Sequence, residues 1–308
     1  MAENREKPVI RSEKGMVLVL TLMILVIITA LVVEFCYDVY TTTSSLYNWK
    51  DAQNLSSIAR SGITLSVKTI NDAQNVYSYT YPGKVEIPVN NIVDGFNGTL
   101  TITIEDENSR LNLNSLIYPN GTLNSDAYFA FRRLLKYLSV DEEIADWVAD
   151  WIDKDSEPRV NGSEEGAKNA PLDSTDELLL IKKITPQIFE IISPYVTVYG
   201  VNNGQAHLIN INTASIPVIM SLDDRITEDL ARRVVQYREL EPFKQISDLM
   251  KVAGFEGSLG QSLMNRIIVK ASNFHIHSIA EQDKIKRIIE CIISINGGSQ
   301  IMRFWKET

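Results

Sequence analysis

The chain has 308 residues, of which 44% are apolar and 22% are charged, enough for a packed core and for more than one domain. Its formal net charge of −9 argues against a general nucleic-acid binder, because such proteins need a basic face for the phosphate backbone. The sequence contains no Walker A loop, no dinucleotide fingerprint and no Gly-x-Ser-x-Gly nucleophile, so we predict that it is not an enzyme.

An apolar run near the start is the clearest single feature. Between Met16 and Val33 there is no charge, no proline and no glycine, and Glu34 is the first ionisable group after it. As a helix this run reaches about 27 Å, close to the thickness of a hydrocarbon core of about 30 Å. We therefore predict a transmembrane helix over 16–37. Four basic residues precede the run: Arg5, Lys7, Arg11 and Lys14. By the positive-inside rule we predict that the N-terminus stays in the cytoplasm and that the bulk of the chain is exported.

The helical spacing continues beyond the predicted span. Apolar or small residues recur on one face at Leu55, Ile58, Gly62, Leu65 and Thr69. With no proline to break it, one long helix is predicted over 16–72. The alternative is an anchor helix followed by a separate amphipathic helix.

Two segments after the helix alternate between apolar and polar residues. They are 85–89 and 100–104, and the turn signals Asp94-Gly95 and Asn97-Gly98 lie between them. This pattern predicts an antiparallel hairpin within 73–118. Segments rich in β-branched residues return over 271–308, and we expect them to join the same sheet.

The intervening region, 119–270, lacks this alternation and is predicted to be an inserted all-α domain. Asp141 is the expected cap of its helix over 142–152. The stretches 169–192 and 210–234 share one pattern: a capped helix, a short turn with Ile-Thr and a second helix, as in helix-hairpin-helix repeats. The predicted fold class is α+β, with a long N-terminal helix packed on an antiparallel sheet.

The residues around the start of the apolar run resemble a known N-terminus. Lys14-Gly15 followed by Met16 and a helix rich in Leu, Val and Ile is similar to type IV prepilins and pseudopilins. The resemblance implies a cytoplasmic leader over 1–15, cut between Gly15 and Met16 by prepilin peptidase, with methylation of the new N-terminal Met16.

The resemblance gives Leu20 a specific meaning. Leu20 occupies the fifth position of the mature chain, where most members of the family carry a glutamate that pairs with the terminal ammonium of the preceding subunit. An unpaired carboxylate is costly in lipid. A subunit at the tip has no predecessor, so Leu20 marks a tip subunit.

The order of the segments, together with Leu20, resembles the K-type minor pseudopilins of type II secretion. The resemblance implies a pilin-like fold and a subunit at the tip of the pseudopilus that primes its assembly and caps it during export of folded proteins. It implies a single-pass protein of the bacterial inner membrane. The implied partners are the minor pseudopilins I, J and H, the major pseudopilin, prepilin peptidase and the inner-membrane secretion platform, without nucleic acid.

Carboxylates concentrate after the helix over 142–152. Those at 153, 155 and 157 alternate along a loop, and Ca²⁺ takes six to eight hard oxygen ligands. The stretch resembles the K-type signature near its calcium sites, although it is short between Glu165 and Asn169. The resemblance implies calcium as the cofactor, and the alternative is a solvated acidic loop. The predicted ligands are Asp150, Asp153, Asp155, Glu157, Glu164 and Glu165.

Two further motifs have structural interpretations. The first repeat turn, 182–185, lacks the Gly-x-Gly that brings backbone amides to phosphate, so we expect the repeats to contact protein rather than DNA. His275 and His277 share a strand face at a spacing that can bind metal. Without a third ligand in the sequence, we interpret them as exposed strand histidines.

Two other functions stay open. One is a minor pilin of a type IV pilus, which the neighbouring genes would separate from a secretion subunit. The other is a membrane-tethered DNA-binding protein of a competence system, which salt-dependent DNA binding would favour.

Overall fold

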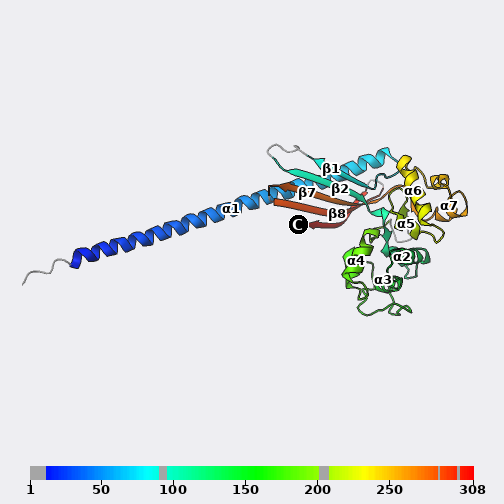
Figure 1. Ribbon diagram of the computed structural model, residues 1–308, viewed down its shortest axis with the longest axis horizontal. Helices are drawn as coiled ribbons and strands as arrows, with labels where there is room; N and C mark the ends of the chain where they lie inside the picture. The colour runs from blue at the N-terminus through cyan, green and yellow to red at the C-terminus, as the bar shows by residue number, and fades with distance from the viewer. Residues whose placement is uncertain (1–11, 90–95, 201–207, 284, 297–298) are drawn as a thin grey trace, which may run out of the picture. The chain divides into compact units, whose positions relative to one another are not determined.

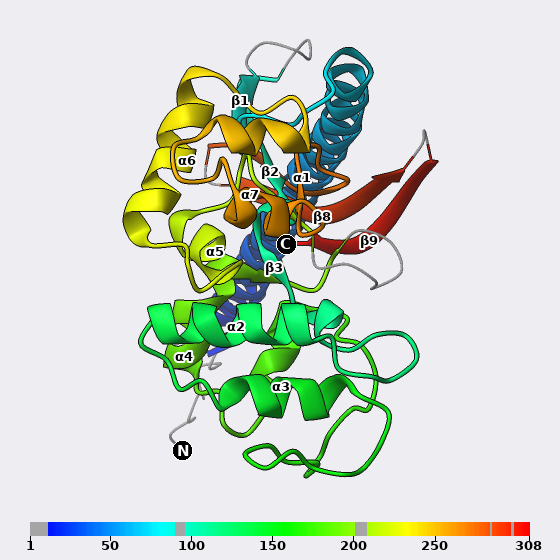
Figure 2. The same cartoon turned by 90° about the vertical axis from the view of Figure 1, so that its right-hand side faces the viewer.

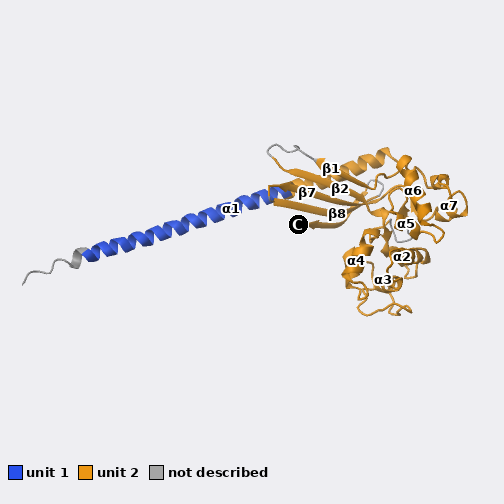
Figure 3. Cartoon of the chain, in the orientation of Figure 1, with its two compact units in different colours: residues 1–55 blue, residues 56–308 orange. Residues whose placement is uncertain are grey.

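The computed structural model describes residues 12–89, 96–200, 208–283, 285–296 and 299–308. Most of the predicted leader and the predicted Asp94-Gly95 turn lie outside these ranges. The chain forms two compact units, residues 1–55 and residues 56–308 (Figure 3).

One continuous helix, α1, runs from Ser12 to Val76. The alternative of an anchor helix followed by a separate amphipathic helix is therefore wrong. The helix ends one turn beyond the predicted boundary at 72. The side chains of its apolar run, from Met16 to Val33, are exposed. Within the described residues, α1 is the one helix that is long and apolar enough to cross a membrane.

The second unit is built on an antiparallel sheet with the strand order β1-β2-β7-β8-β9 (Figure 1). Strands β2 and β7 are neighbours in the sheet although the whole helical region separates them in sequence. The helical region is therefore an insertion between two paired strands of a pilin-like α+β fold. The strands are β1 (Lys84–Val89), β2 (Thr99–Asp106), β7 (Asn273–Gln282), β8 (Ile285–Asn296) and β9 (Ser299–Glu307).

The part of α1 that belongs to the second unit covers one face of this sheet (Figure 2). Its buried residues are Ser56, Ala59, Gly62, Ile63, Ser66 and Ile70. The predicted stripe is wrong at its far end, because Leu65 and Thr69 are exposed. The physical reason is size: small side chains at 59, 62 and 66 let the helix backbone approach the sheet, so the buried face is rotated toward them.

The insertion contains two lobes, each with its own core. The first core gathers buried residues between Leu111 and Val198, and the second gathers buried residues between Ile209 and Val269. Each lobe is closed by a short parallel pair: β3 (Leu111–Asn112) with β4 (Val196–Thr197), and β5 (Ile209–Asn210) with β6 (Ile267–Ile268). The sequence predicts a short strand over 195–200, which contains β4, but it does not predict either pairing.

The helices of the first lobe are η1 (Glu107–Ser109), η2 (Leu113–Leu116), α2 (Ser125–Tyr137), α3 (Ile144–Ile152), η3 (Thr175–Leu180), α4 (Pro186–Ile192) and η4 (Ser193–Tyr195). Those of the second lobe are α5 (Ile216–Ser221), α6 (Glu228–Leu240), η6 (Ile246–Lys251) and α7 (Ser258–Leu263). Thr185 and Thr227 cap α4 and α6 through their hydroxyls, which explains the repeated Ile-Thr turn.

The expected cap of α3 is wrong by two residues. The N-cap is Glu143, and Asp141 instead accepts a hydrogen bond from the backbone N–H of Glu143 at 3.0 Å. Asp141 therefore shapes the turn before α3 rather than its first turn, because its carboxylate reaches the N–H two residues ahead.

Candidate functional site

The predicted acidic site forms where α3 ends. Asp150 lies in the last turn of the helix and Asp153 follows it as the C-cap, with its backbone N–H bonded to the carbonyl of Ala149. Both side chains are buried, at 0% and 1% exposed. Two buried carboxylates this close need a cation, because burial penalises each charge and their repulsion is weakly screened.

Arg159 supplies one positive charge. Its guanidinium forms ion pairs with both Asp150 and Asp153, and its backbone N–H donates to Asp150 Oδ2 at 3.1 Å. The loop after α3 is thereby folded back onto the helix end.

Glu164 brings a third carboxylate to the same place. Asp150, Asp153 and Glu164 each offer an oxygen within 4.8 Å of the others. Both oxygens of Glu164 and Oδ1 of Asp153 are buried and find no hydrogen-bond donor in the part of the chain that the structure describes. Burial, followed by the charges of Asp153 and Asp150, raises the pKa of Glu164. Three carboxylates against one guanidinium leave the cluster short of positive charge.

Gly162 makes the approach of the loop to Asp150 possible. A Cβ atom at this position would lie 1.9 Å from Asp150 Oδ2, far inside contact distance. A glycine is therefore required sterically beside the buried carboxylate.

The other three predicted ligands lie outside this cluster. Asp155 and Glu157 are exposed, and Asp155 Oδ1 accepts the backbone N–H of Glu157 at 2.9 Å. Glu165 is exposed and pairs with Lys182 at 3.1 Å. The alternation that suggested them does not hold, because the loop turns on itself after Asp153 instead of running extended.

One polar group near the cluster was not predicted. Asn169 has a φ of 52° and donates its backbone N–H to the carbonyl of Trp151 at 3.0 Å. Its Oδ1 is buried, and within the described ranges nothing donates to it. The positive φ, which asparagine tolerates better than most residues, is a signal that a single sequence does not reveal.

The helix-hairpin-helix-like turns hold their basic groups in ion pairs. Lys183 in the first turn lies 2.8 Å from Asp141 and also pairs with Glu143. Arg225 in the second turn forms a bidentate pair with Asp223, with both distances 2.8 Å. These cations are engaged within the protein rather than presented free to a phosphate.

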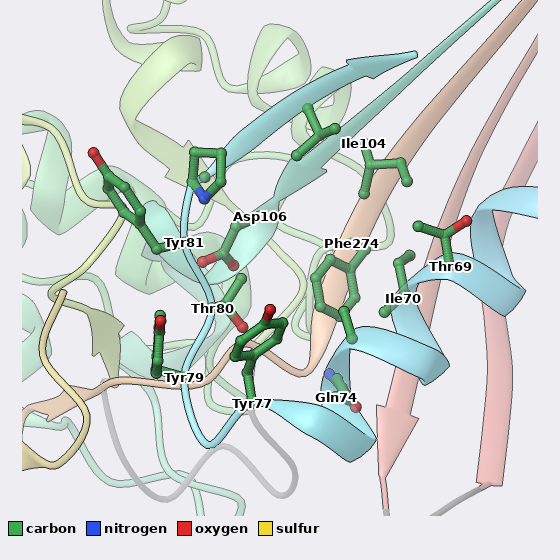
Figure 4. Close-up of a pocket in the computed structure, with 14 residues that line it drawn as sticks. Thr69, Ile70, Gln74, Tyr77, Tyr79, Thr80, Tyr81, Ile104, Asp106 and Phe274 are labelled. Atoms are coloured by element: carbon green, nitrogen blue, oxygen red, sulfur yellow. The ribbon is translucent and has the colours of Figure 1, made fainter. Parts of the chain in front are cut away.

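A cavity of about 150 Å³ lies where α1 gives way to the sheet, and the sequence did not predict it. Tyr77, Tyr79 and Tyr81 line it, together with Asp106 and Phe274 (Figure 4). Apolar atoms dominate the lining of this cavity, and the carboxylate of Asp106 is one of its few polar groups.

Asp106 ties the sheet to the second lobe at this cavity. Its Oδ2 accepts from Asn210 Nδ2 at 2.7 Å and from Thr213 Oγ1 at 2.6 Å, and its Oδ1 accepts the backbone N–H of Asn108 at 2.7 Å. Burial raises the pKa of Asp106 to about 6. These three bonds hold the end of β2, η1 and the second lobe together.

The predicted processing residues lie in the first unit. Gly15, Met16 and Leu20 all lie in the N-terminal part of α1, and all three are exposed. A Cβ at Gly15 would meet no atom within 4 Å in the described structure, so packing does not explain this glycine.

Comparison with known proteins gives the family. Two sequence profiles described as type II secretion system, protein K, match residues 109–201 and 209–270, which together cover both lobes of the insertion. The chain is 28% identical over 170 residues to type II secretion system protein K of Dickeya chrysanthemi, a match that covers 50% of this chain and 47% of the relative. It is 28% identical over 226 residues to the protein K of Aeromonas hydrophila, covering 63% and 66% of the two chains. The chain thus spans about half to two thirds of the length of these relatives.

The fold also matches a solved structure. A chain of the GspK-GspI-GspJ complex from the type 2 secretion system of enterotoxigenic Escherichia coli superposes with a TM-score of 0.66 at 19% identity, covering 86% of this chain and 99% of that one. The match extends the likeness from the insertion to the helix and sheet around it. The chain belongs to the type II secretion system protein K family.

Proposed function

We propose that this chain is a minor pseudopilin at the tip of a type II secretion pseudopilus. The observation that carries the proposal is the family match over an insertion that stands between two paired strands of a pilin-like sheet. The role is mechanical: the subunit primes assembly of the pseudopilus and caps it during export of folded proteins. No catalytic step is assigned to it.

The N-terminal features support membrane anchoring and processing. The exposed apolar run of α1 fits a single span of the inner membrane, with the N-terminus in the cytoplasm. Prepilin peptidase would cut between Gly15 and Met16, and Met16 would then be methylated. The mass of the mature protein from its native membrane tests this step: loss of residues 1–15 with one added methyl group supports it, and an intact N-terminus contradicts it.

The partners in this proposal are the minor pseudopilins I, J and H, together with the major pseudopilin and the inner-membrane platform. The solved structure of similar fold is a complex of GspK with GspI and GspJ, which supports the choice of I and J. In this chain the face of α1 turned away from the sheet is free to pack against other long helices. Its exposed residues are Ser57, Ser61, Thr64 and Lys68.

We also propose that the acidic cluster binds calcium through Asp150, Asp153 and Glu164. The support is that Oδ1 of Asp153 and both oxygens of Glu164 are buried without a donor among the described residues, and a hard cation that prefers oxygen ligands would satisfy them. Calcium would supply the positive charge that Arg159 alone does not, and so hold the loop against α3. The role is structural.

Photo-crosslinking tests the tip proposal. A crosslinking amino acid is placed at Ser57, Ser61, Thr64 or Lys68 of the full chain in its native host, and its adducts are identified by mass spectrometry. We expect adducts with the I and J minor pseudopilins, and loss of secretion when the gene is deleted. A matched control carries the crosslinker at Lys154, which is exposed in the first lobe, and should not give the same adducts.

Two results would contradict the tip proposal. If the α1 positions crosslink to successive copies of the major pseudopilin, or if secretion continues without the chain, the subunit is not at the tip. Salt-dependent DNA binding by the full chain would favour the competence alternative instead.

A further inference from the structure

Two histidines lie side by side on the open face of the sheet. His275 and His277 are on β7, and because side chains alternate along a strand they point away from the face that α1 covers. Their ring centroids are 4.2 Å apart. The interpretation of both as exposed is wrong: His275 is only 13% exposed, and His277 is half-buried.

The neighbouring strand supplies a carboxylate to this pair. Glu290 on β8 lies opposite His277 in the register of the sheet. Its Oε1 lies 2.8 Å from His275 Nε2. The three residues each offer one ligand atom within 4.8 Å of the others. Glu290 is the third group that the sequence did not reveal, since only strand pairing brings it to the histidines.

A buried acid stands behind His275 on the other side of its ring. Glu107 is 2% exposed, and its Oε1 lies 3.3 Å from His275 Nδ1. Glu107 is itself fixed, because Arg110 Nη1 donates to it at 2.8 Å and Thr197 Oγ1 donates to it at 2.5 Å. His275 therefore has one ring nitrogen next to an anchored carboxylate and the other next to Glu290. In metal sites a carboxylate orients a ligating histidine by accepting its second ring N–H. Glu107 lies on the correct side of the ring for this role, although His275 Nδ1 makes no hydrogen bond to a described residue in the present ring orientation.

We propose that His275, His277 and Glu290 form a site for a transition-metal dication of the zinc type. Imidazole nitrogens with one carboxylate suit Zn²⁺ rather than Ca²⁺, which prefers oxygen alone. In the structure a proton joins His275 to Glu290, and the metal would replace that proton. Ligand atoms around a tetrahedral Zn²⁺ lie about 3.3–3.5 Å apart, so small side-chain rotations close the present spacing.

The surroundings leave room for a fourth ligand. A cavity of about 100 Å³ adjoins the cluster and is lined from the sheet by His275, Glu290 and Lys306, and from the first lobe by Thr197 and Tyr199. The charged groups near the site include Glu105, which lies opposite His275 in the sheet, and those that line the cavity: Glu107, Arg110, Asp176 and Lys306. Through Glu107 and Thr197, the metal would brace the sheet against the first lobe.

Zinc titration of the full chain tests the proposal. The protein is purified in detergent through a tag without histidine, and zinc affinity is measured by competition with a chromophoric chelator in millimolar Ca²⁺, which occupies the carboxylate cluster at α3. We expect one Zn²⁺ per chain at this site. His275→Ala and His277→Ala should each weaken binding by more than about 100-fold, and Glu107→Gln by about 10- to 100-fold. Glu281→Gln, an acid further along β7, is the matched control and should change nothing.

A second readout does not depend on any variant. The chain has three histidines, so long-range ¹H–¹⁵N spectra of their rings are simple to assign. One equivalent of Zn²⁺ should shift the ring nitrogens of His275 and His277 and lock their tautomers. The proposal is overturned if these resonances stay in place at one equivalent, or if zinc affinity is the same in the wild type and in the two histidine variants.

Discussion

At the scale of single residues, Glu164 combines two buried oxygens with no donor among the described residues and a partly shielded position beside two other acids. This combination is unfavourable unless a cation is bound or the group is protonated. The neighbouring Glu165 is exposed and has Lys182 as a partner. The pair therefore offers a test in which adjacent glutamates have different roles.

Glu164→Gln should abolish the stabilisation of the protein by calcium. With calcium at a hundredfold excess over its Kd, the wild type should gain about 2.7 kcal/mol in the free energy of unfolding. The variant should gain almost none, while its stability without calcium should not fall, because one of three repelling charges is gone. Thermal unfolding with and without calcium measures both. Glu165→Gln is the control, and an equal calcium response in the two variants would rule out Glu164 as a ligand.

Asp106 gives a prediction about pH. Its pKa rises from 3.8 in the unfolded chain to about 6 in the fold, so the folded state holds the proton more tightly. Stability from this group is complete below pH 3.8, falls between pH 3.8 and 6, and stays low above that range. The loss is about 3 kcal/mol at 1.36 kcal/mol per unit.

Asp106→Asn removes this titration. We expect the free energy of unfolding of the variant, relative to the wild type, to increase as the pH is raised from 4 to 6.5, and then to level off. Carboxylates whose pKa is lowered and that do not interact with Asp106, such as Glu307, change in the opposite direction but cancel in the difference between the two proteins. Chemical denaturation at several pH values measures it. A difference that is flat with pH would mean that Asp106 is ionised at no cost.

At the scale of elements, the contact between α1 and the sheet depends on one glycine and one serine. A Cβ at Gly62 would lie 2.2 Å from Ser278 Oγ and 3.3 Å from Leu100 Cδ1. Ser278 is fully buried, and its hydroxyl has no hydrogen-bond partner among the described residues. The backbone of α1 at Gly62 therefore packs directly against the side chain of Ser278 on β7. The hydroxyl of Ser278 contributes no hydrogen bond to stability.

Gly62→Ala should destabilise the fold by about 1–3 kcal/mol through overpacking, despite the better helix propensity of alanine. Ser278→Ala alone should be neutral or stabilising, because it removes an unpaired hydroxyl. The double variant should recover most of the loss, giving a coupling energy that a double-mutant cycle of unfolding free energies measures. Purely additive effects would show that the helix does not sit at this distance from β7.

The same contact explains which elements were predictable from sequence. The span, the strands and the long helix follow from strong periodic patterns in composition. The buried stripe of α1 follows only in part: Leu55 and Gly62 were predicted correctly, whereas Leu65 and Thr69 were chosen in place of the small residues Ala59 and Ser66 that face the sheet. The short strands β3, β5 and β6 were missed because two-residue strands carry no period, and β4 was predicted within 195–200 but without its partner.

The candidate sites divide along the same line. Asp150, Asp153 and Glu164 were found because carboxylates cluster in the sequence, but Asp155 and Glu157 were included on the assumption of an extended loop. Glu290 was missed because its proximity to His277 depends on strand register. Counting outward from the pair Gln282 and Ile285 would have placed His277 opposite Glu290.

At the scale of the whole molecule, the position of the insertion is the informative feature. Strands β2 and β7 pair along their whole length although two lobes of chain separate them, so the sheet does not depend on the insertion for its strand order. Arg133 joins the lobes to each other by donating to the carbonyl oxygens of Ser221 and Leu222 at 2.7 and 3.2 Å. A bulky, internally fixed insertion on a pilin-like sheet suits a subunit beyond which no other subunit is added.

Leu20 is the complementary feature of the first unit, and its substitution tests the tip proposal directly. A glutamate there would face lipid without a preceding subunit to supply an ammonium. The cost of membrane insertion would approach the value of about 2.5–3.5 kcal/mol for a charge at the centre of a span. We therefore expect Leu20→Glu to lower the amount of protein in the membrane without improving pseudopilus assembly, as judged by immunoblots of membranes and of sheared pseudopili. Leu25→Glu places the same charge elsewhere in the exposed apolar run and should behave alike. If instead the Leu20 variant entered the shaft as readily as a major pseudopilin, while the Leu25 variant did not, the fifth position would be a working pairing site and the chain would not be confined to the tip.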